Sequence, residues 1–264
     1  MTIKLTASDV NKICNEISDN QIKKISNCVM FVGHAHSGHS LIGALLDSHS
    51  KTAISNHLNI PNLLNKHKLT KAQLYKIILY FSLKNNDKNG WINTGYNYQI
   101  NSGFQGRVLN PILVGDKQGG ASTRIILKNP ELVNRMIDLI GDELKIIFVY
   151  RNELDNIAAY AHYMKEELSI KHVRRYFENL ETVFSIKKVI KVENWFQINH
   201  ESFISDPPQQ IKVFFDFLGL TYNSNQINNI CEIVKQSPNK RRKQIKWNDE
   251  LLKIINTQMK LLTS

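Results

Sequence analysis

The chain has 264 residues, of which 42% are hydrophobic, so it is long and apolar enough to form one large domain with a buried core. Its 34 Lys and Arg residues against 23 Asp and Glu residues give a formal net charge of +11, which favours anionic ligands, but the basic residues are too dispersed to favour nucleic acid as the main ligand. The three cysteines lack the spacing of a zinc site, no apolar run reaches membrane-spanning length and the first residues lack a signal-peptide core, so we expect a cytoplasmic protein.

The first quarter of the chain is predicted to form a helix, a strand, a loop and a second helix, with the regular elements over 9–26, 28–32 and 39–48. In the loop, Gly33 and Gly38 stand five positions apart, and the hydroxyl of Ser40 follows two positions later. This spacing is similar to that of the phosphate-binding loop G-x-x-x-x-G-K-[ST], whose backbone N–H groups and helix N-terminus attract anions. His39 stands where nucleotide triphosphatases need lysine, so we expect the loop to hold a phosphate but to be poorly equipped to cleave a triphosphate.

The second quarter is predicted to contain a short strand over 51–55, a helical stretch over 61–84 and, after a long irregular segment, a strand over 112–114. The irregular segment, 85–111, contains aromatic residues without a period: Trp91, Tyr96, Tyr98 and Phe104. Long loops in compact domains are usually functional or disordered, so this segment is a candidate lid over a substrate site. Its aromatic residues either line that site or pack on the core.

The second half contains the clearest buried strand, 144–150, which ends at Arg151. The other elements expected there are a strand over 195–198 and helices over 130–140, 153–166, 169–188, 207–218, 224–236 and 248–262. The alternation of strands and helices predicts a single α/β domain over 1–264, with three α/β/α layers and a central, mostly parallel sheet. Because ligands bind at the carboxyl ends of parallel strands, the loops after Val32, Val114 and Tyr150 should converge on one site.

Four segments, in the right order, resemble the sulfotransferases that use 3′-phosphoadenosine 5′-phosphosulfate (PAPS). The family's 5′-phosphosulfate loop is similar to VMFVGHAHSGHSLIGALLDSHS (29–50), and its 3′-phosphate segment is similar to KIIFVYRNELDNIAAYAHYM (145–164). Its Y-E-D-L-x-x-D-P…F-L-G-L stretch resembles NHESFISDPPQQIKVFFDFLGL (199–220), and its basic C-terminal loop resembles SPNKRRKQIKW (237–247). The resemblance covers 28–247 and implies a P-loop-like sulfotransferase domain, which transfers a sulfuryl group from PAPS to a hydroxyl or amine without a metal.

The resemblance also implies which residues bind the cofactor. The residues that would cradle the phosphosulfate through backbone N–H and hydroxyl groups are Ser37, Gly38, His39 and Ser40. His36 would face the bridging oxygen, and Arg151 would bind the 3′-phosphate with its planar guanidinium unless it forms an ion pair with Asp155. The basic run that would close over the nucleotide, or else form a solvated face, is Lys240, Arg241 and Arg242.

Two further residues would take part in the reaction. Lys117 resembles the family's lysine near the transferred sulfate, and it could supply the positive charge that the family's Arg or Lys provides at position 36. His57 falls where related enzymes carry a Glu or His that deprotonates the acceptor, a task suited to an imidazole with an ordinary pKa of about 6.5. The structural alternatives are a solvated loop lysine, a surface histidine and, for His36, a residue that fills a turn.

Departures from the family pattern leave other functions open. His36 and His39 replace an Arg or Lys and a Thr, and Ala159 replaces a Ser that would contact the 3′-phosphate. A non-catalytic binder of a phosphonucleotide or sulfated glycan and a P-loop kinase are two alternatives. A third is a zinc hydrolase, because His34, His36 and His39 form an H-x-H-x-x-H pattern. The acceptor, a carbohydrate or another hydroxyl compound, is not specified by the sequence.

Overall fold

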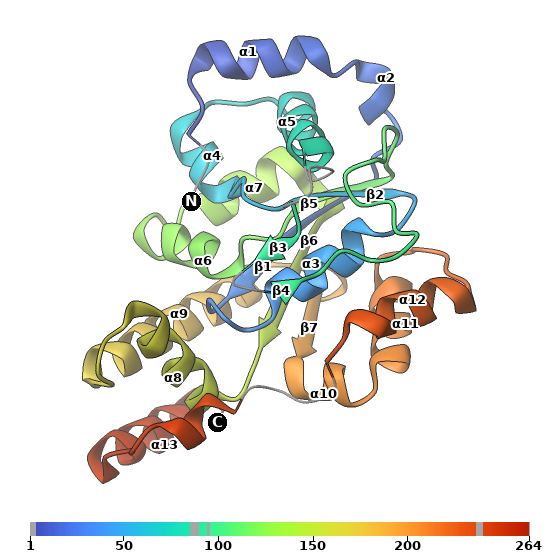
Figure 1. Cartoon of the computed structure of the whole chain (residues 1–264). Helices are drawn as coiled ribbons and strands as arrows, with labels where there is room; N and C mark the ends of the chain where they lie inside the picture. Colours follow the sequence, from blue (N-terminus) through green and yellow to red (C-terminus); the bar gives the residue numbers. More distant parts are fainter. Residues whose placement is uncertain (1–3, 85–89, 94–95, 236–239, 264) are drawn as a thin grey trace.

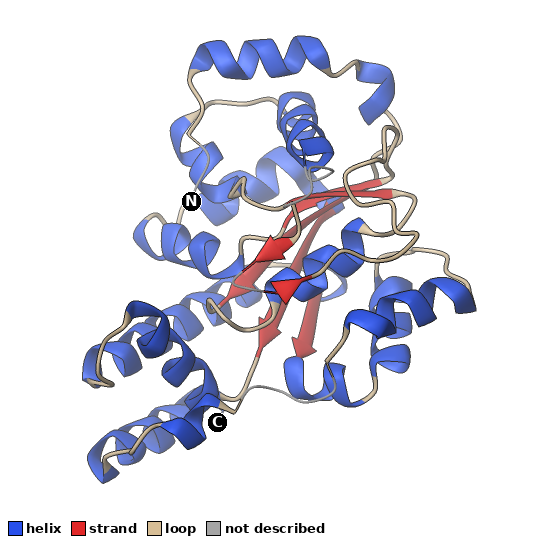
Figure 2. Ribbon diagram, viewed as in Figure 1, coloured by secondary structure: helices blue, strands red, loops and turns tan. Residues whose placement is uncertain are grey.

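The computed structural model describes residues 4–84, 90–93, 96–235 and 240–263. Its centre is a parallel five-stranded sheet with the strand order β2-β5-β1-β6-β7 (Figure 1). The strands are β1 (Asn27–Gly33), β2 (Thr52–Ser55), β5 (Leu113–Asp116), β6 (Leu144–Tyr150) and β7 (Trp195–Asn199). Helices cover both faces of the sheet (Figure 2), so the predicted three-layer α/β/α architecture is confirmed.

The central strand, β1, divides its side chains between two hydrophobic cores. Cys28, Met30 and Val32 pack into the core on one face, whereas Val29 and Phe31 pack into the core on the other face. All five side chains are fully buried, as expected for a strand of a parallel sheet that is covered on both faces. The two cores therefore hold the carboxyl end of β1, and the loop that follows it, between two helical layers.

Each helical layer contributes to one of these cores. The layer over Cys28, Met30 and Val32 comprises α1 (Ala7–Glu16), α4 (Ile60–Lys66), α5 (Lys71–Leu83), α6 (Gly119–Lys128), α7 (Leu132–Ile140), α8 (Glu153–Met164), α9 (Ile170–Val189) and α13 (Asp249–Thr263). The opposite layer comprises α3 (His39–Asp47), α10 (His200–Ser205), α11 (Pro207–Phe217) and α12 (Ser224–Ile233). None of the helices in the described ranges combines the length and apolarity that crossing a bilayer requires.

Several boundaries differ from the sequence-based expectation. The helix predicted over 9–26 divides into α1 and α2 (Asp19–Ile22), because Ser18 forms a capping box with Gln21 and starts a new helix. The stretch 61–84 divides into α4 and α5 in the same way, with Thr70 as the cap of α5.

Two helices and a two-stranded hairpin were not expected. Helix α6 was missed because it begins with Gly119 and Gly120, which have low helix propensity. The others are α10 and a hairpin of β3 (Ile92–Asn93) and β4 (Tyr96–Asn97). Parts of two predicted segments, 85–89 and 94–95 of the long loop and 236–239 at the start of the basic loop, lie outside the described residues.

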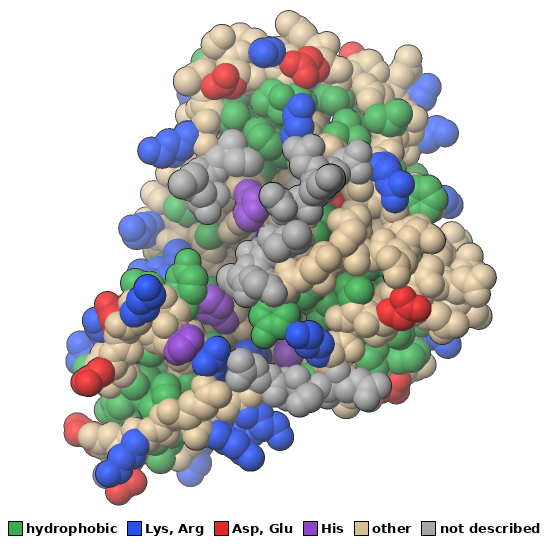
Figure 3. Space-filling view, viewed as in Figure 1, with side chains coloured by type: hydrophobic (Ala, Val, Ile, Leu, Met, Phe, Trp, Pro, Cys, Tyr) green, Lys and Arg blue, Asp and Glu red, His purple; other side chains and the backbone are tan. Residues whose placement is uncertain are grey.

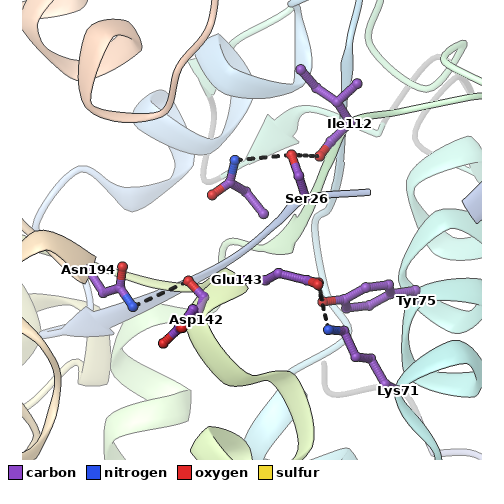
Figure 4. Close-up of polar contacts among 8 residues, drawn as sticks. Ser26, Lys71, Tyr75, Ile112, Asp142, Glu143 and Asn194 are labelled. Atoms are coloured by element: carbon purple, nitrogen blue, oxygen red, sulfur yellow. Dashed lines mark hydrogen bonds and ion pairs between the residues drawn. The ribbon is translucent and has the colours of Figure 1, made fainter. Parts of the chain in front are cut away.

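Polar contacts fix the amino edge of the sheet, where the strands begin. The residues drawn in Figure 4 include Ser26, Lys71, Tyr75, Ile112, Asp142, Glu143 and Asn194. Glu143, directly before β6, accepts hydrogen bonds from Lys71 Nζ at 2.5 Å and from the Tyr75 hydroxyl, both on α5. Asn194, directly before β7, donates to the carbonyl oxygen of Asp142 at 3.3 Å. These contacts stabilise the amino edge of the sheet, so a ligand site is expected at the opposite, carboxyl edge.

Candidate functional site

A cleft of about 1160 Å³ opens at the carboxyl edge of the sheet. Its walls come from the loops after β1, β2, β5 and β6, from α10 after β7, from β4, from the end of α12 and from the 3-10 turn η4 (Arg241–Gln244). Five histidines and four Lys or Arg residues line it, and none of the described lining residues is Asp or Glu. Histidine and basic side chains gather around the hollow in Figure 3, whereas the acidic side chains of this face lie mostly toward its edges. The cleft therefore suits an anionic ligand.

The loop between β1 and α3 forms one wall of the cleft. Gly38 caps α3 with a φ of 105°, and a Cβ at this position would lie 2.6 Å from Cδ2 of His200, so a glycine is required. Ser37 is fully buried and does not line the cleft, because its hydroxyl accepts a hydrogen bond at 3.0 Å from Asn156 of α8. The same Asn156 amide donates to the Ala35 carbonyl oxygen at 2.9 Å. The loop is thus held rigidly, and the start of α3 faces the cleft.

His39 lines the cleft, but its ring is buried and bonded within the protein. Its Nε2 lies 3.1 Å from the carbonyl oxygen of Val32, and only glycine fits at position 119 against the ring. Burial lowers the pKa of His39 to about 4. The ring is therefore neutral at pH 7 and donates to Val32, so it does not replace the lysine of a triphosphatase.

His36 lies in the cleft with its ring 4.9 Å from that of Tyr163, in a left-handed backbone conformation with a φ of 64°. Burial, followed by the charge of Arg151, lowers the pKa of His36. The ring of His36 is therefore neutral at pH 7 in the free protein. Its carbonyl oxygen accepts a 3.4 Å hydrogen bond from Arg151 Nη1, which ties the end of β6 to the loop after β1.

Lys117 is the best-placed cation beside the loop. Its Nζ donates to the Ser40 hydroxyl at 2.9 Å, and the side chain is largely buried in the cleft wall. Burial lowers the pKa of Lys117 to about 8, against the opposing effect of Asp116. The ammonium is still mostly protonated at pH 7, so Lys117 supplies a positive charge at Ser40, in the first turn of α3.

Asp116 positions the loop that carries His57. Its carboxylate accepts hydrogen bonds from the backbone N–H groups of Leu58 at 3.2 Å and Asn59 at 3.0 Å. It also accepts from the Ser55 hydroxyl at 2.9 Å. Although burial raises the pKa of Asp116 to about 6, these donors stabilise its charged form, so it is mostly ionised at pH 7.

Gln118 contacts the ring of His57 directly. Its Nε2 donates to the Asn56 carbonyl oxygen at 3.1 Å, which fixes the orientation of the amide, and lies 3.4 Å from Nδ1 of His57. In this arrangement Nδ1 is the acceptor and the neutral ring carries its proton on Nε2. Burial and the charge of Lys117 lower the pKa of His57 to about 4, so the ring is neutral over the physiological range.

The basic segment at 240–243 contributes one side chain to the cleft. Arg241 lines the cleft and donates to Gln244 at 2.8 Å, whereas Lys240 and Arg242 do not line it. Arg242 instead binds Asp155 of α8, with its backbone N–H at 2.9 Å and Nη1 at 3.4 Å from the carboxylate oxygens. Asp155 therefore holds the basic segment against α8, rather than forming the ion pair with Arg151 that the sequence left open.

The aromatic residues of 85–111 divide between the core and the cleft. Trp91 is buried, and its Nε1 donates to Asp47 at 2.9 Å, so it belongs to the core. Phe104 is half exposed and lies outside the cleft lining, whereas Tyr96 and Tyr98 line the cleft. Both predictions for the aromatic residues are therefore correct in part: Trp91 packs in the core, whereas Tyr96 and Tyr98 line the cleft.

Several cleft residues were not found from the sequence. His200 lies at the start of α10, directly after β7, with Nδ1 buried and without a hydrogen-bond partner among the described residues. The rule that located Arg151 after β6, ligand residues at the carboxyl ends of parallel strands, applies equally to His200. His162 and Tyr163 lie on the cleft side of α8, which no strand end would have indicated.

The three histidines of the H-x-H-x-x-H pattern have separate surroundings. His34 is buried and stacks on Tyr176 at 4.0 Å, His36 lies against Tyr163, and His39 bonds to Val32. Within the described ranges, no group of three His, Cys, Asp or Glu residues is placed to hold a metal ion. These histidines therefore do not form the joint ligand set that a zinc hydrolase of this pattern requires.

Comparison with known proteins identifies the fold. No protein-family model and no curated protein sequence matches the chain. The sulfotransferase domain from the curacin biosynthetic pathway matches with a TM-score of 0.50 at 12% identity, over 85% of this chain and 81% of that one. The sulfotransferase domain of the Synechococcus PCC 7002 olefin synthase matches with a TM-score of 0.50 at 11% identity, over 86% and 82%. A sulfotransferase from Mycobacterium avium matches with a TM-score of 0.52 at 9% identity, over 94% and 78%. The chain therefore has the sulfotransferase fold.

Proposed function

We propose that this chain transfers a sulfuryl group from PAPS to a hydroxyl or amine of an acceptor, without a metal. The observation that carries the proposal is the composition of the cleft. A phosphate-binding type of loop, a buried lysine and two arginines meet in it, and no acidic residue is found among the described residues that line it. Such a site suits a donor with phosphate groups at two ends, and the fold is that of sulfotransferases.

The residues of the cleft fit the two ends of the donor. The backbone at Gly38, His39 and Ser40 would receive the 5′-phosphosulfate, since side chains are excluded at Gly38 and the N-terminus of α3 attracts anions. Arg151 and Arg241 would bind the 3′-phosphate. Ser37 and Arg242 would not contact the donor themselves in this proposal. Ser37 would support the site through its hydrogen bond with Asn156, and Arg242 through its contact with Asp155.

Lys117 would stabilise the charge that develops during transfer. The donor supplies an activated sulfuryl group, whose bond from sulfur to the phosphate oxygen breaks as the bond to the acceptor oxygen forms. Lys117 is protonated at neutral pH, since its pKa lies at about 8, and it reaches the start of α3 through Ser40. It therefore takes the role of a metal ion in neutralising the leaving phosphate, with His36 as a neutral hydrogen-bond donor nearby.

His57 would accept the proton of the acceptor hydroxyl. A base must be neutral to do so, and a pKa of about 4 keeps the ring neutral at pH 7. Because Gln118 donates toward Nδ1, the neutral ring carries its proton on Nε2, and it must give up the contact with Gln118 and take its proton on Nδ1 before Nε2 can act as the base. Gln118 thus controls which nitrogen of His57 is available.

Nucleotide binding tests the donor site. We expect 3′-phosphoadenosine 5′-phosphate to bind more tightly than adenosine 5′-phosphate in isothermal titration calorimetry. Arg151→Ala should remove this preference at a cost of about 1.5–3 kcal/mol, the strength of a hydrogen bond to a charged group. Arg174→Ala, on the exposed side of α9, is the matched control and should retain the preference. Equal binding of the two nucleotides by the unaltered protein would refute the donor assignment.

Turnover separates the proposed enzyme from its alternatives. Transfer of label from PAPS to an acceptor should persist in the presence of a chelator, because Lys117 supplies the positive charge. Loss of transfer on chelation, restored by zinc, would instead support the hydrolase alternative. Tight binding of 3′-phosphoadenosine 5′-phosphate without transfer to a broad set of alcohols, phenols and amines would identify a non-catalytic binder.

A further inference from the structure

One basic residue that lines the cleft, Lys235, has no role in the proposed donor site. Lys235, directly after α12, lines the cleft, and its Nζ lies 4.7 Å from the centre of the Tyr96 ring. Tyr96 in turn stacks on Tyr98, with the ring centres 6.0 Å apart. Lys235 forms no ion pair within the ranges that the structure describes. A cation–π contact thus holds an ammonium group at the cleft without neutralising it.

Lys235 follows α12, whereas Arg151 and the basic segment adjoin α8. Helix α12 packs through Ile227 and Ile230 into one core of the sheet, whereas α8, which borders Arg151 and docks the basic segment, packs through Ile157 into the other core. The two helices accordingly lie on opposite sides of the carboxyl edge in Figure 1. A donor bound to Arg151 and Arg241 would leave Lys235 to face the second substrate.

Three apolar side chains that pack into the same core as α12 also line the cleft: Leu41, Ile204 and Ile233. The ring of Tyr98 packs against this core and lines the cleft as well. Lys235 is exposed, so an anion can reach its ammonium group. Because the described lining residues include no Asp or Glu, a cationic substrate would find no carboxylate partner among them.

We propose that Lys235, held by Tyr96, forms an acceptor subsite for an anionic group. The acceptor is then a small hydroxylated compound that carries a carboxylate, sulfate or phosphate beside an apolar portion. The ammonium binds the anion, and the apolar portion packs on Leu41, Ile204 and Ile233. This inference rests on the proposed function, since it assigns the arginine side of the cleft to the sulfuryl donor.

The test uses three phenols of equal size and different charge. They are 4-hydroxyphenylacetate, 4-hydroxyphenylacetamide and tyramine, which are anionic, neutral and cationic. With labelled PAPS, we expect kcat/KM for the anion to exceed that for the amide about ten-fold, a difference of about 1.4 kcal/mol, with tyramine poorest. Lys235→Gln should bring the ratio of anion to amide close to one, and Lys235→Glu should favour tyramine. Lys212→Gln, on the exposed side of α11, is the matched control and should keep the original ratio.

Binding measurements separate failure of this inference from failure of the proposed function. Saturation-transfer NMR of the three phenols is recorded with 3′-phosphoadenosine 5′-phosphate present at saturation, so that the donor cations are filled. A preference for the anion that Lys235→Gln abolishes supports the subsite even if no transfer is seen. An anion-to-amide ratio that Lys235→Gln leaves unchanged overturns it, whether or not PAPS proves to be the donor. With 4-hydroxyphenyl phosphate and 4-hydroxyphenyl sulfate in place of the carboxylate, the same measurement identifies the preferred anion.

Discussion

The pKa values of the ionisable side chains in the cleft depend on burial as much as on residue type. The sequence suggested an ordinary pKa of about 6.5 for the imidazole of His57. In the structure the pKa values of His36 and His57 are both lowered, to about 4 for His57, so both rings are neutral at pH 7. Lys117, with a pKa of about 8, is then a cleft residue that is charged at pH 7 and loses its charge as the pH rises above 8.

This difference predicts the pH dependence of kcat/KM. The rate should fall below pH 4, where His57 becomes protonated, and above pH 8, where Lys117 loses its positive charge. Lys117→Arg carries a permanent charge and should remove the alkaline limb, even if the rate at neutral pH falls several-fold. His36→Gln should leave that limb in place. If the alkaline limb persists in Lys117→Arg and disappears in His36→Gln, the catalytic charge belongs to His36.

Gln118 gives a second prediction for the pH profile. Gln118→Glu places a carboxylate 3.4 Å from Nδ1 of His57, where it accepts a proton instead of donating one. The ring then carries its proton on Nδ1, which frees Nε2, and the negative charge raises the pKa of His57. The acid limb of kcat/KM should therefore move to higher pH. Gln118→Leu, which removes the polar contact without adding charge, is the control, and an acid limb common to both variants would show that Gln118 does not act on His57.

Among the elements, long apolar strands could be predicted and capped or glycine-led helices could not. β1 and β6 are continuous apolar runs, so their positions were confirmed within a residue or two. Helix α6 escaped detection because a glycine pair opens it, and the reason for the pair is tertiary: Gly119 leaves room for the His39 ring, and a side chain on Gly120 would strike the backbone at Ala35. Such packing cannot be read from the local sequence.

The contact of Asp155 with Arg242 is another feature that local sequence does not reveal, because it joins α8 to the segment after α12. Asp155→Asn should weaken this docking and displace Arg241 from the cleft. We expect the affinity for 3′-phosphoadenosine 5′-phosphate to fall about ten-fold, or about 1.4 kcal/mol, while that for adenosine 5′-phosphate stays constant. Calorimetry measures both affinities.

Limited proteolysis with trypsin, which cleaves after Lys and Arg, is a second test of how Asp155 docks the basic segment at 240–243. Cleavage at 240–243 should be faster in Asp155→Asn than in the unaltered protein, and the bound nucleotide should slow it. Asp138→Asn, on the exposed side of α7, removes the same charge away from the basic segment and should change neither affinity nor cleavage. An equal loss of affinity in both variants would point to net charge rather than docking.

At the scale of the whole molecule, the amino and carboxyl edges of the sheet have different roles. The amino edge is fixed by contacts such as those of Glu143 with Lys71 and Tyr75, whereas the carboxyl edge carries the cleft. The sequence predicted the location of the site through the strand-end rule, because that rule depends only on topology. It did not predict the contact of Lys235 with Tyr96, because these two residues meet only through the fold.

The strand order also determines when the cleft can form during synthesis of the chain. β1 and the loop after it are made early, but the strands that flank β1 are β5 and β6, with Cys28 paired to Val114 on one side and to Leu144 on the other. Until those strands emerge from the ribosome, β1 has no hydrogen-bonding partner and exposes a hydrophobic edge. Parallel pairings between distant segments form slowly, so refolding should take milliseconds to seconds, and a nascent chain that lacks β6 should depend on a chaperone to avoid aggregation.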